Sequence, residues 1–340
     1  MRILVTGLGS HLGSRVARAL EQEPSVEVVV GVDADEPRLP LTTTEFVRVD
    51  SSYSIVQRIA AATRVDTILH LGAITDSTEV GRRALHETNV IGTANVVAAA
   101  AGGTVRKLVV KSSAHIYGSS FDDPYWFRED TPRKRPPEDG LERSLLESDD
   151  MVRELAEDDR RVMVTRLRYA DVLGGEVGSP FSRVLQLPVV PEILGFDPRL
   201  QFLHEHDAVA AIIFATLNQV PGVFNVAGAG VMPWSEVCAA VGKRRVPLPP
   251  LLTASAVEPL RRLRIAAIPK ETLRLLRYGR AIDTSRYQRA GFRFTHTTAS
   301  AVDAFAQLLR LRSSASDATE YRYEHDVETF LHHSPSVVRD

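Results

Sequence analysis

The chain has 340 residues, 44% hydrophobic and 25% charged, so it can bury a full core in one large domain or two interleaved ones. The formal net charge of -2 excludes a global electrostatic field that recruits nucleic acid. The single cysteine, Cys238, excludes an internal disulfide, fits a reducing compartment and is expected to be a small buried hydrophobe.

The first residues predict a buried strand and not a secretory signal, because residues 1–5 run directly into Thr6-Gly7. No apolar run approaches the roughly 20 residues that a membrane helix requires. We therefore expect a cytoplasmic protein without an integral membrane segment.

Short runs rich in valine and isoleucine alternate with segments that carry alanine and branched aliphatics at helical spacing. The strand-like runs are 2–6, 26–33, 46–49, 67–71, 107–111 and 162–167, and the helical segments include 12–20 and 84–101. This alternation predicts an α/β fold, a Rossmann-type doubly wound parallel sheet with helices on both faces.

After residue 174 the pattern changes to a Pro- and Gly-rich stretch, followed by a predicted helix at 207–217 and a strand at 222–226. We interpret residues 1–173, with 202–228 returning to them, as the Rossmann domain. Residues 174–201 and 229–312 are predicted to form a smaller interleaved substrate lobe. The tail at 313–340 lacks periodicity and is expected to be weakly ordered.

A glycine-rich loop follows the first predicted strand and opens the first predicted helix. In the stretch Gly7-Leu8-Gly9-Ser10-His11-Leu12-Gly13, glycines allow a pyrophosphate to approach the amides at the helix N-terminus. Asp33 ends the second strand twenty residues after Gly13, where a carboxylate can bind a ribose 2′-hydroxyl. An acid there favours NAD over NADP, because it would repel a 2′-phosphate. The alternatives are a turn aspartate and a purely structural glycine turn.

Further short motifs follow in an order that resembles one family. They are Asp50, His70-Leu71-Gly72-Ala73, Asn89-Val90-Ile91-Gly92-Thr93 and Ser112-Ser113-Ala114-His115-Ile116-Tyr117-Gly118. Together with the glycine loop and Asp33 they resemble the extended short-chain dehydrogenase/reductases. Within these, the similarity is to the NAD-dependent epimerase/dehydratase group, in particular actinobacterial UDP-glucose 4-epimerase-like proteins. It covers roughly residues 1–305 and is strongest before Gly118.

The resemblance implies a set of cofactor contacts. Asp50 and Ser51 would lie against the adenine, His11 and Leu12 would border the pyrophosphate, and Leu71, Gly72 and Ala73 would line the far side of the cofactor. Ser10 stands where the family has its middle glycine, at a point where the backbone must approach phosphate closely. This substitution puts the affinity for the cofactor in question, and the alternative is a shifted loop that Gly9 permits.

The resemblance also implies a catalytic set, and this chain lacks most of it. In the family a serine or threonine binds the substrate oxygen, a tyrosine exchanges the proton, and a lysine four residues later lowers the tyrosine pKa and holds the nicotinamide ribose. Ser113 matches the first role, although a strand-end serine can also simply satisfy local backbone. No tyrosine here is followed by lysine four residues later. The flanking pattern places the missing pair at Leu141 and Leu145, which costs about 10²- to 10⁴-fold in general acid–base catalysis.

Three residues near Ser113 are possible substitutes. His115 and Tyr117 follow the strand end, and either could face elsewhere. Lys111 lies on the same side of the strand as Ser113 by alternation. It could reach solvent, a nearby carboxylate or the cofactor.

The substrate half departs from the family as well. Asp171 replaces an asparagine that touches the nucleotide-sugar, and a carboxylate would repel a diphosphate. The family's pyrophosphate-binding arginine corresponds to Leu200, with Arg199 one residue away. Asp207 is expected mainly to cap the following helix.

The sequence therefore leaves three hypotheses. The first is an NAD-dependent epimerase/dehydratase-like enzyme that acts on a nucleotide-sugar or related alcohol by hydride transfer. Its catalysis would be impaired or altered and would use Ser113 and His115. The second is a catalytically inactive NAD-binding sensor or scaffold. The third assigns the arginine-studded stretch 257–280 to a lipid surface, although a solvated helix face is commoner. We expect no metal site. Family members pair through helices that correspond here to 84–101 and 142–155, which predicts a homodimer.

Overall fold

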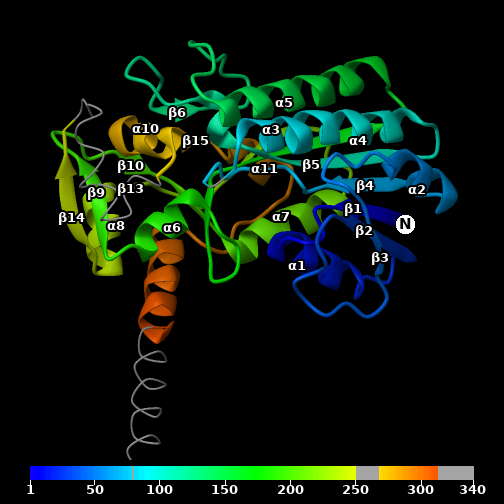
Figure 1. Ribbon diagram of the computed structural model, residues 1–340, viewed down its shortest axis with the longest axis horizontal. Coiled ribbons are helices and arrows are strands. Elements are labelled where there is room, and N and C mark those ends of the chain that lie inside the picture. Colours follow the sequence, from blue (N-terminus) through cyan, green and yellow to red (C-terminus); the bar gives the residue numbers. More distant parts are fainter. Residues whose placement is uncertain (79, 250–267, 313–340) are drawn as a thin grey trace, which may run out of the picture.

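The computed structural model describes residues 1–78, 80–249 and 268–312. Its centre is a sheet of seven parallel strands in the order β12-β7-β5-β4-β1-β2-β3 (Figure 1). The strands are β1 (Arg2–Thr6), β2 (Val28–Asp33), β3 (Glu45–Arg48), β4 (Thr67–His70), β5 (Lys107–Ser113), β7 (Met163–Tyr169) and β12 (Gly222–Val226). The predicted doubly wound α/β fold is confirmed, with each predicted strand present to within two residues at either end.

Two layers of helices cover the sheet, and strand periodicity explains why. On one face α1 (His11–Leu20) packs beside α7 (Glu205–Leu217), and on the other lie α2 (Val56–Ala62), α4 (Gly92–Ala101) and α5 (Gly140–Asp158) (Figure 1). Because successive side chains of a strand point to opposite faces, Ile3 and Val5 join the α1–α7 core while Leu4 joins the core under α2 and α4.

The predicted helix at 84–101 is divided into three pieces. A short helix, α3 (Arg82–Leu85), leads through one π-helical turn (His86–Ile91) into α4. The turn places the Asn89 side chain inward, where it accepts a hydrogen bond from the Ile74 amide and donates to the Ile74 carbonyl and to the Ser144 hydroxyl. Such turns interrupt helices where a side chain serves a purpose outside the helix. Here Asn89 fixes the loop that follows β4.

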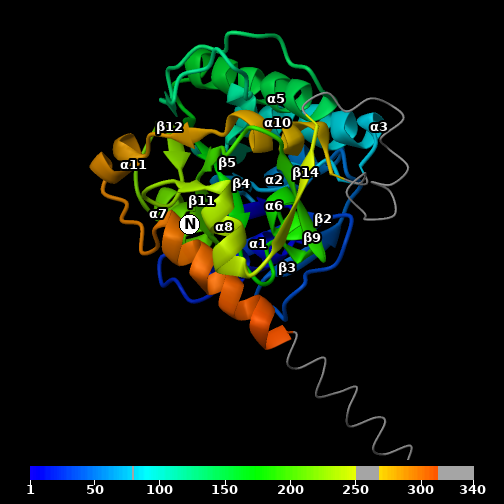
Figure 2. The same cartoon turned by 90° about the vertical axis from the view of Figure 1, so that its left-hand side faces the viewer.

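The remaining elements gather at the end of the molecule seen in Figure 2. They form small paired strands and short helices, namely β6 (Trp126–Phe127) with β15 (Ala281–Ile282), β8 (Asp171–Leu173) with β11 (Phe202–His204), β9 (Val189–Ile193) with β14 (Arg244–Leu248), β10 (Arg199–Leu200) with β13 (Met232–Pro233), α6 (Pro180–Gln186), α8 (Trp234–Val241), α10 (Lys270–Tyr278) and helical residues 298–312. Helix α11 (Ser285–Arg289) instead packs on β12, with Tyr287 in the α1–α7 core. A second core, with Phe181, Trp234 and Phe305, lies among them. Cys238 is buried in this core, and burial raises the pKa of its thiol to about 12.

Two sequence predictions fall outside the described residues. They concern the tail at 313–340 and the arginines at 261, 262 and 264. Among the described residues, no helix combines the length and the apolar character needed to cross a bilayer.

Candidate functional site

A cavity of about 720 Å³ lies over the carboxyl ends of β1, β2, β4, β5 and β7. In open parallel sheets this edge, with the loops that follow the strands, forms the ligand crevice. The predicted site residues that line it are Gly7, Gly9, Ser10, His11, Leu12, Asp33, Ser51, Leu71, Gly72, Ala73, Ser113 and His115. Gly13 and Asp50 do not line it.

The glycines of the first loop are required by close packing. Gly7 has a φ of +77°, and a Cβ on it would lie 2.5 Å from the Gly72 nitrogen. A Cβ on Gly13 would lie 2.1 Å from the Gly7 carbonyl oxygen. The turn after β1 therefore packs tightly against the loop after β4. Gly13 does not line the cavity, but its lack of a side chain lets α1 approach this turn.

Ser10 begins α1 as its N-cap. Its hydroxyl donates to the Gly7 carbonyl oxygen at 2.8 Å and accepts from the Gly13 amide at 2.9 Å. The serine that replaces the middle glycine thus stabilises the loop conformation. Among the described residues, the backbone N–H groups of His11 and Leu12 have no protein acceptor. These donors and the positive end of the helix dipole are available to an anion in the cavity.

Asp33 ends β2, and three backbone amides hold its carboxylate, that of Asp35 at 3.4 Å. One carboxylate oxygen accepts from the Gly9 amide at 2.8 Å and the other from the Ala34 amide at 2.7 Å. Arg38 also lines the cavity, and its Nε donates to the Gly9 carbonyl oxygen at 3.3 Å. Sequence reasoning missed Arg38, since only the residues directly after Asp33 were weighed for a cation.

Asp50 holds its own turn. Its carboxylate accepts hydrogen bonds from the hydroxyls of Ser52 and Ser54, which lower its pKa to about 2. The neighbouring Ser51 and Tyr53 line the cavity instead. Tyr53 has a φ of 54° and was not predicted.

At the other end of the cavity Ser113, His115 and Asp171 come together. The Ser113 Oγ accepts from the His115 amide at 3.2 Å and begins a 3₁₀ turn over Ala114–Tyr117. The His115 Nε2 lies 3.8 Å from the Asp171 carboxylate and has no hydrogen-bond partner. Asp171 also faces Arg280 at 4.0 Å. Burial by itself would raise the pKa of Asp171, but His115 and Arg280 outweigh it and lower that pKa.

Lys111 lines the same cavity, on the side of Ser113 as alternation predicted. Its Nζ donates to the Ala73 carbonyl oxygen at 3.2 Å, and it forms no ion pair with a carboxylate of the described residues. Desolvation lowers the pKa of this ammonium group to about 8.

No tyrosine presents a free hydroxyl to the cavity among the described residues. The Tyr169 hydroxyl donates to the Ala208 carbonyl oxygen at 2.7 Å. The Tyr53 hydroxyl lies against the loop, within hydrogen-bonding reach of Thr6 and Gly7. The Tyr117 hydroxyl donates to Asn225 at 2.8 Å and accepts from Arg168 at 3.0 Å, outside the cavity. Tyr117 therefore does not serve as a substitute proton donor, because the turn after β5 directs its ring into the core.

A family model described as the NAD dependent epimerase/dehydratase family matches residues 3–227. The chain belongs to this family. A protein of Mycobacterium tuberculosis (strain ATCC 25618 / H37Rv), itself uncharacterised, is 34% identical over 311 residues, which cover 89% of this chain and 82% of the relative.

Solved structures of the same fold include two epimerases. UDP-glucuronic acid 4-epimerase from Bacillus cereus in complex with NAD is 17% identical, with a TM-score of 0.70 over 92% of this chain and 99% of the other. UDP-glucose 4-epimerase from Thermotoga maritima with UDP-glucose is 18% identical, with a TM-score of 0.70 and the same coverage of both chains. At this identity the likeness establishes the fold.

Leu141 and Leu145, at the positions expected to carry the family's tyrosine and lysine, are buried on α5. Both pack in a cluster with Ile116, Tyr117 and Phe127. Neither lines the large cavity. Leu145 borders a separate void of about 10 Å³ together with Lys111 and Ala73. Helix α5 therefore contributes packing here and no titratable group at either position.

The substrate end of the cavity contains one arginine that the sequence did not single out. Leu200 is buried in the second core, and Arg199 lies over the Tyr125 ring, so neither enters the cavity. Arg183 of α6 lines it and pairs with Asp76 at 3.0 Å. The expected repulsion of a diphosphate by Asp171 is also reduced, because Arg280 offsets its charge.

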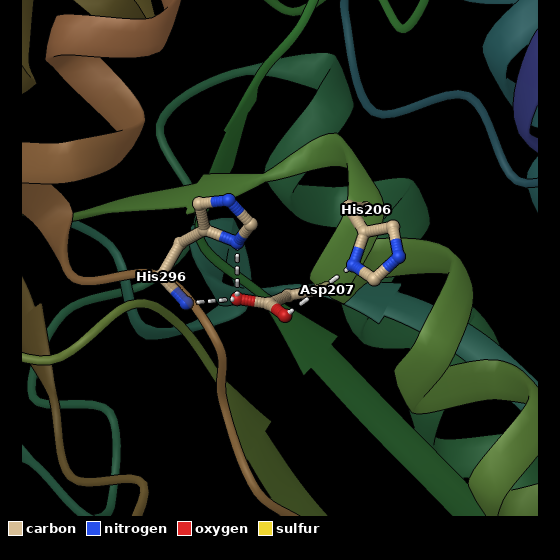
Figure 3. Close-up of side chains that lie close together, drawn as sticks. All are labelled: His206, Asp207 and His296. Carbon is tan, nitrogen blue, oxygen red and sulfur yellow. Dashed lines mark hydrogen bonds and ion pairs between the residues drawn. The ribbon is translucent and has the colours of Figure 1, made fainter.

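Asp207 does not cap α7, contrary to expectation. The helix begins at Glu205 with His204 as its N-cap, whose side chain accepts from the His206 amide. The buried Asp207 carboxylate accepts hydrogen bonds from the Thr295 amide and hydroxyl and from the His296 amide. Figure 3 shows the carboxylate between the rings of His206 and His296, at 4.0 Å and 3.4 Å from their Nδ1 atoms.

This His206–Asp207–His296 cluster has the spacing of a metal site, but its carboxylate is already bonded to the chain. Three donors hold this carboxylate, namely the Thr295 amide, which reaches both oxygens, the Thr295 hydroxyl and the His296 amide. The cluster therefore connects α7 to residues 295 and 296.

The described arginines of the 257–280 stretch bind within the protein. Arg274 bonds to Glu138 at 3.0 Å and also to Asp139 and Glu142. Arg277 lies 5.0 Å from the centroids of the Phe196 and Tyr278 rings. These contacts favour the commoner alternative for Arg274, whose guanidinium group is held by three carboxylates, while for Arg277 the lipid-surface hypothesis stays a prediction.

Proposed function

We propose that the chain binds NAD in the 720 Å³ cavity and acts on the hydroxyl group of a nucleotide-sugar or related alcohol with altered chemistry. One observation carries the proposal. Unpaired amides at the start of α1 and the Asp33 carboxylate open into the same cavity as Ser113 and His115. Together they provide an anion site, a ribose acceptor and a polar end.

The loop residues fit the dinucleotide. His11 and Leu12 would donate to the pyrophosphate, and Asp33 retains acceptor capacity for a ribose hydroxyl after accepting from Gly9, Ala34 and Asp35. When bound, NAD supplies an acceptor for hydride from an alcohol carbon. Asp33 excludes a 2′-phosphate by charge, which supports NAD over NADP.

The chain's own residues would manage the substrate proton. Ser113 can donate from Oγ to the substrate oxygen, because its only described contact is as an acceptor of the His115 amide. His115 lines the cavity, and its buried, unpartnered Nε2 is the atom that would take the proton of the substrate hydroxyl. Asp171, 3.8 Å away, would stabilise the resulting imidazolium.

The substrate class follows from the far end of the cavity. Arg183 provides a cation beside the α6 N-terminus, where Ser179 and Pro180 also line the cavity. This arrangement suits a phosphate-bearing substrate. The similar epimerase structures contain UDP-glucose or UDP-glucuronic acid. We assign residues 174–201 and 229–312 to the lobe that supplies this end, and residues 1–173 with 202–228 to the cofactor domain.

A specific observation favours the second candidate, an inactive NAD-binding sensor or scaffold. Leu141 and Leu145 are packed in the core, so the family's proton donor and lysine have no counterpart on α5. Binding without turnover would then be the function.

Calorimetric titration with NAD and NADP tests the binding proposal. We expect saturable binding of NAD and at least about tenfold weaker binding of NADP, since Asp33 opposes an added phosphate. No binding of either nucleotide at millimolar concentration would overturn the proposal.

Turnover separates the two candidates. Protein, NAD and a panel of UDP-sugars are incubated while the absorbance of reduced nicotinamide and the sugar products are followed. Ser113→Ala should abolish any activity, whereas Ser112→Ala, on the opposite side of β5, should retain it. NAD binding without product across the panel would select the sensor.

We also propose that α4 and α5 form the interface of a homodimer. The two helices pack side by side on one face of the sheet, and Ile91 just before α4 is 42% exposed. Light scattering of the purified chain tests this, and a monomeric mass at micromolar concentration would overturn it.

A further inference from the structure

Two lysines of the same strand have very different surroundings. Lys107, at the start of β5, donates to the carbonyl oxygens of Ala215, Thr216 and Asn218 at 3.2, 2.6 and 2.8 Å. An ammonium group has three donors and no acceptor, so Lys107 is fully satisfied. Its role is to tie the end of α7 to the sheet.

Lys111, four residues later, has one such bond. Its Nζ meets the Ala73 carbonyl oxygen at 3.2 Å, and no other described residue accepts from it. Two N–H donors therefore remain, on a side chain that lines the large cavity. A partly desolvated cation without a carboxylate partner is costly to hold, and this cost is reduced when a ligand supplies oxygen acceptors.

The order of the strands indicates which part of a bound dinucleotide lies next to Lys111. Asp33 ends β2, the amides of α1 follow β1, and β4 and β5 come next across the sheet. In a dinucleotide the two sugars lie on opposite sides of the pyrophosphate. With one sugar at Asp33 and the pyrophosphate at α1, the second sugar falls over β4 and β5, beside Ala73 and Lys111.

No other lysine of the described residues lines the cavity, and the two α5 positions are leucines. We infer that Lys111 binds the hydroxyl groups of the nicotinamide-side ribose, so that strand β5 supplies a cation that helix α5 lacks. The inference rests on the proposed binding of NAD. It makes Lys111 a cofactor-binding residue of this chain, with the Ala73 carbonyl holding its ammonium group in place.

Truncated ligands locate this contact. Calorimetry is done with ADP, which lacks the second ribose, and with ADP-ribose, which has it. In the full-length protein, Lys111→Met should weaken the binding of ADP-ribose and of NAD about tenfold. This is the loss expected when hydrogen bonds from a charged donor are removed. The affinity for ADP should be unchanged.

The matched control is Lys107→Met, on the same strand and outside the cavity. It should leave both affinities unchanged while lowering the thermal unfolding temperature. If that variant does not fold, Lys243→Met serves instead, because Lys243 also donates to one carbonyl oxygen, that of Leu187, and lies outside the cavity.

The outcomes are distinct. If wild-type protein binds neither ADP nor ADP-ribose, the proposed function itself fails. If wild-type protein binds both and Lys111→Met binds ADP-ribose equally well, only the role of Lys111 is overturned. Equal weakening of ADP and ADP-ribose, or the same loss in the control variant, would also overturn it.

Discussion

The carboxylate of Asp33 accepts a hydrogen bond from the Gly9 amide at 2.8 Å, so the acid that ends β2 also holds the loop that follows β1. A Cβ on Gly9 would lie 2.8 Å from the Asp35 carbonyl oxygen, so the loop packs directly against the residues that follow β2. The position of the ribose acceptor and that of the phosphate donors are thereby coupled.

Replacing Asp33 with Asn tests this arrangement. The amide can keep the Gly9 contact through its oxygen but loses the negative charge and one acceptor. We expect the Kd for NAD to rise about tenfold, as for a lost hydrogen bond to a charged group. NADP should lose less affinity, because Arg38 then faces a 2′-phosphate without an opposing acid. Calorimetry with both nucleotides measures the ratio.

Glu36→Gln is the control for this change. Glu36 lies three residues from Asp33 but is exposed, pairs with Arg48 and does not line the cavity. Its variant should keep the wild-type ratio of NAD to NADP affinity. An unchanged ratio in Asp33→Asn as well would show that the acid does not select the nucleotide.

Lys111 and Leu145 border the same small void from opposite elements, so the site should accommodate one cation but not two. Leu145→Lys alone should lower the free energy of unfolding by about 3–5 kcal/mol, because it buries a second ammonium group beside the first. In the Lys111→Met background the loss should be smaller by at least about 1 kcal/mol. Urea denaturation of the wild type, the two single variants and the double variant measures this coupling energy between positions 111 and 145.

Leu141→Lys is the matched control for the pair. It is equally buried on α5 but does not border that void, so Lys111→Met should not relieve its destabilisation. If both lysine variants respond alike, the relief reflects general stabilisation and not an exchange of cations.

The sheet could be predicted from the sequence because its signal is local. Valine and isoleucine runs mark strands buried on both faces, and the glycine loop with Asp33 defines one end of the cavity within 33 residues. Strand β5 was predicted two residues short, because Ser112 and Ser113 are polar although they still pair with β7.

The parts that could not be predicted depend on contacts between distant residues. The π-helical turn exists because Asn89 bonds to Ile74 and Ser144, which lie 15 and 55 residues away. The charge of Asp171 is offset by Arg280, which lies more than 100 residues later in the chain, so no local sequence pattern predicts their pairing.

The separation of His115 from Tyr117 has a similar origin. Strand alternation would have placed both on the side of Ser113. The strand ends at Ser113, and the following 3₁₀ turn leaves His115 on the cavity while Tyr117 enters the core. Sequence periodicity cannot reveal where one regular structure gives way to another within four residues.

His70 should make the protein sensitive to acid. It is fully buried between the hydroxyls of Thr6 and Thr93, and desolvation with the nearby Lys111 charge lowers its pKa to about 4. The unfolded chain has a histidine pKa of about 6.5 and so binds this proton first. Stability is therefore complete above about pH 6.5 and falls as the pH drops towards 4, by about 3 kcal/mol in total.

Urea denaturation at pH 7 and pH 4.5 checks this, with His70→Gln as the comparison. The variant should lose about 2–3 kcal/mol less than the wild type between the two pH values, because glutamine does not titrate. The pKa of His204 is also lowered, but His204 is present in both proteins, so its contribution to the stability loss cancels in the comparison. Equal losses in the two proteins would assign the acid sensitivity to other groups.

Arg274 should stabilise the fold by holding α10 against the start of α5. Its guanidinium group bonds to Glu138, Asp139 and the Glu142 carboxylate, and the Glu142 side chain is only 2% exposed. Arg274→Met would leave Glu142 with Arg133 alone, so we expect the free energy of unfolding to fall by about 3 kcal/mol. Arg153→Met, which removes exposed pairs on α5, should change it by less than about 1 kcal/mol. Urea denaturation of the two variants decides the point: equal small effects would mean that Arg274 is an ordinary surface cation, as the lipid-surface hypothesis requires.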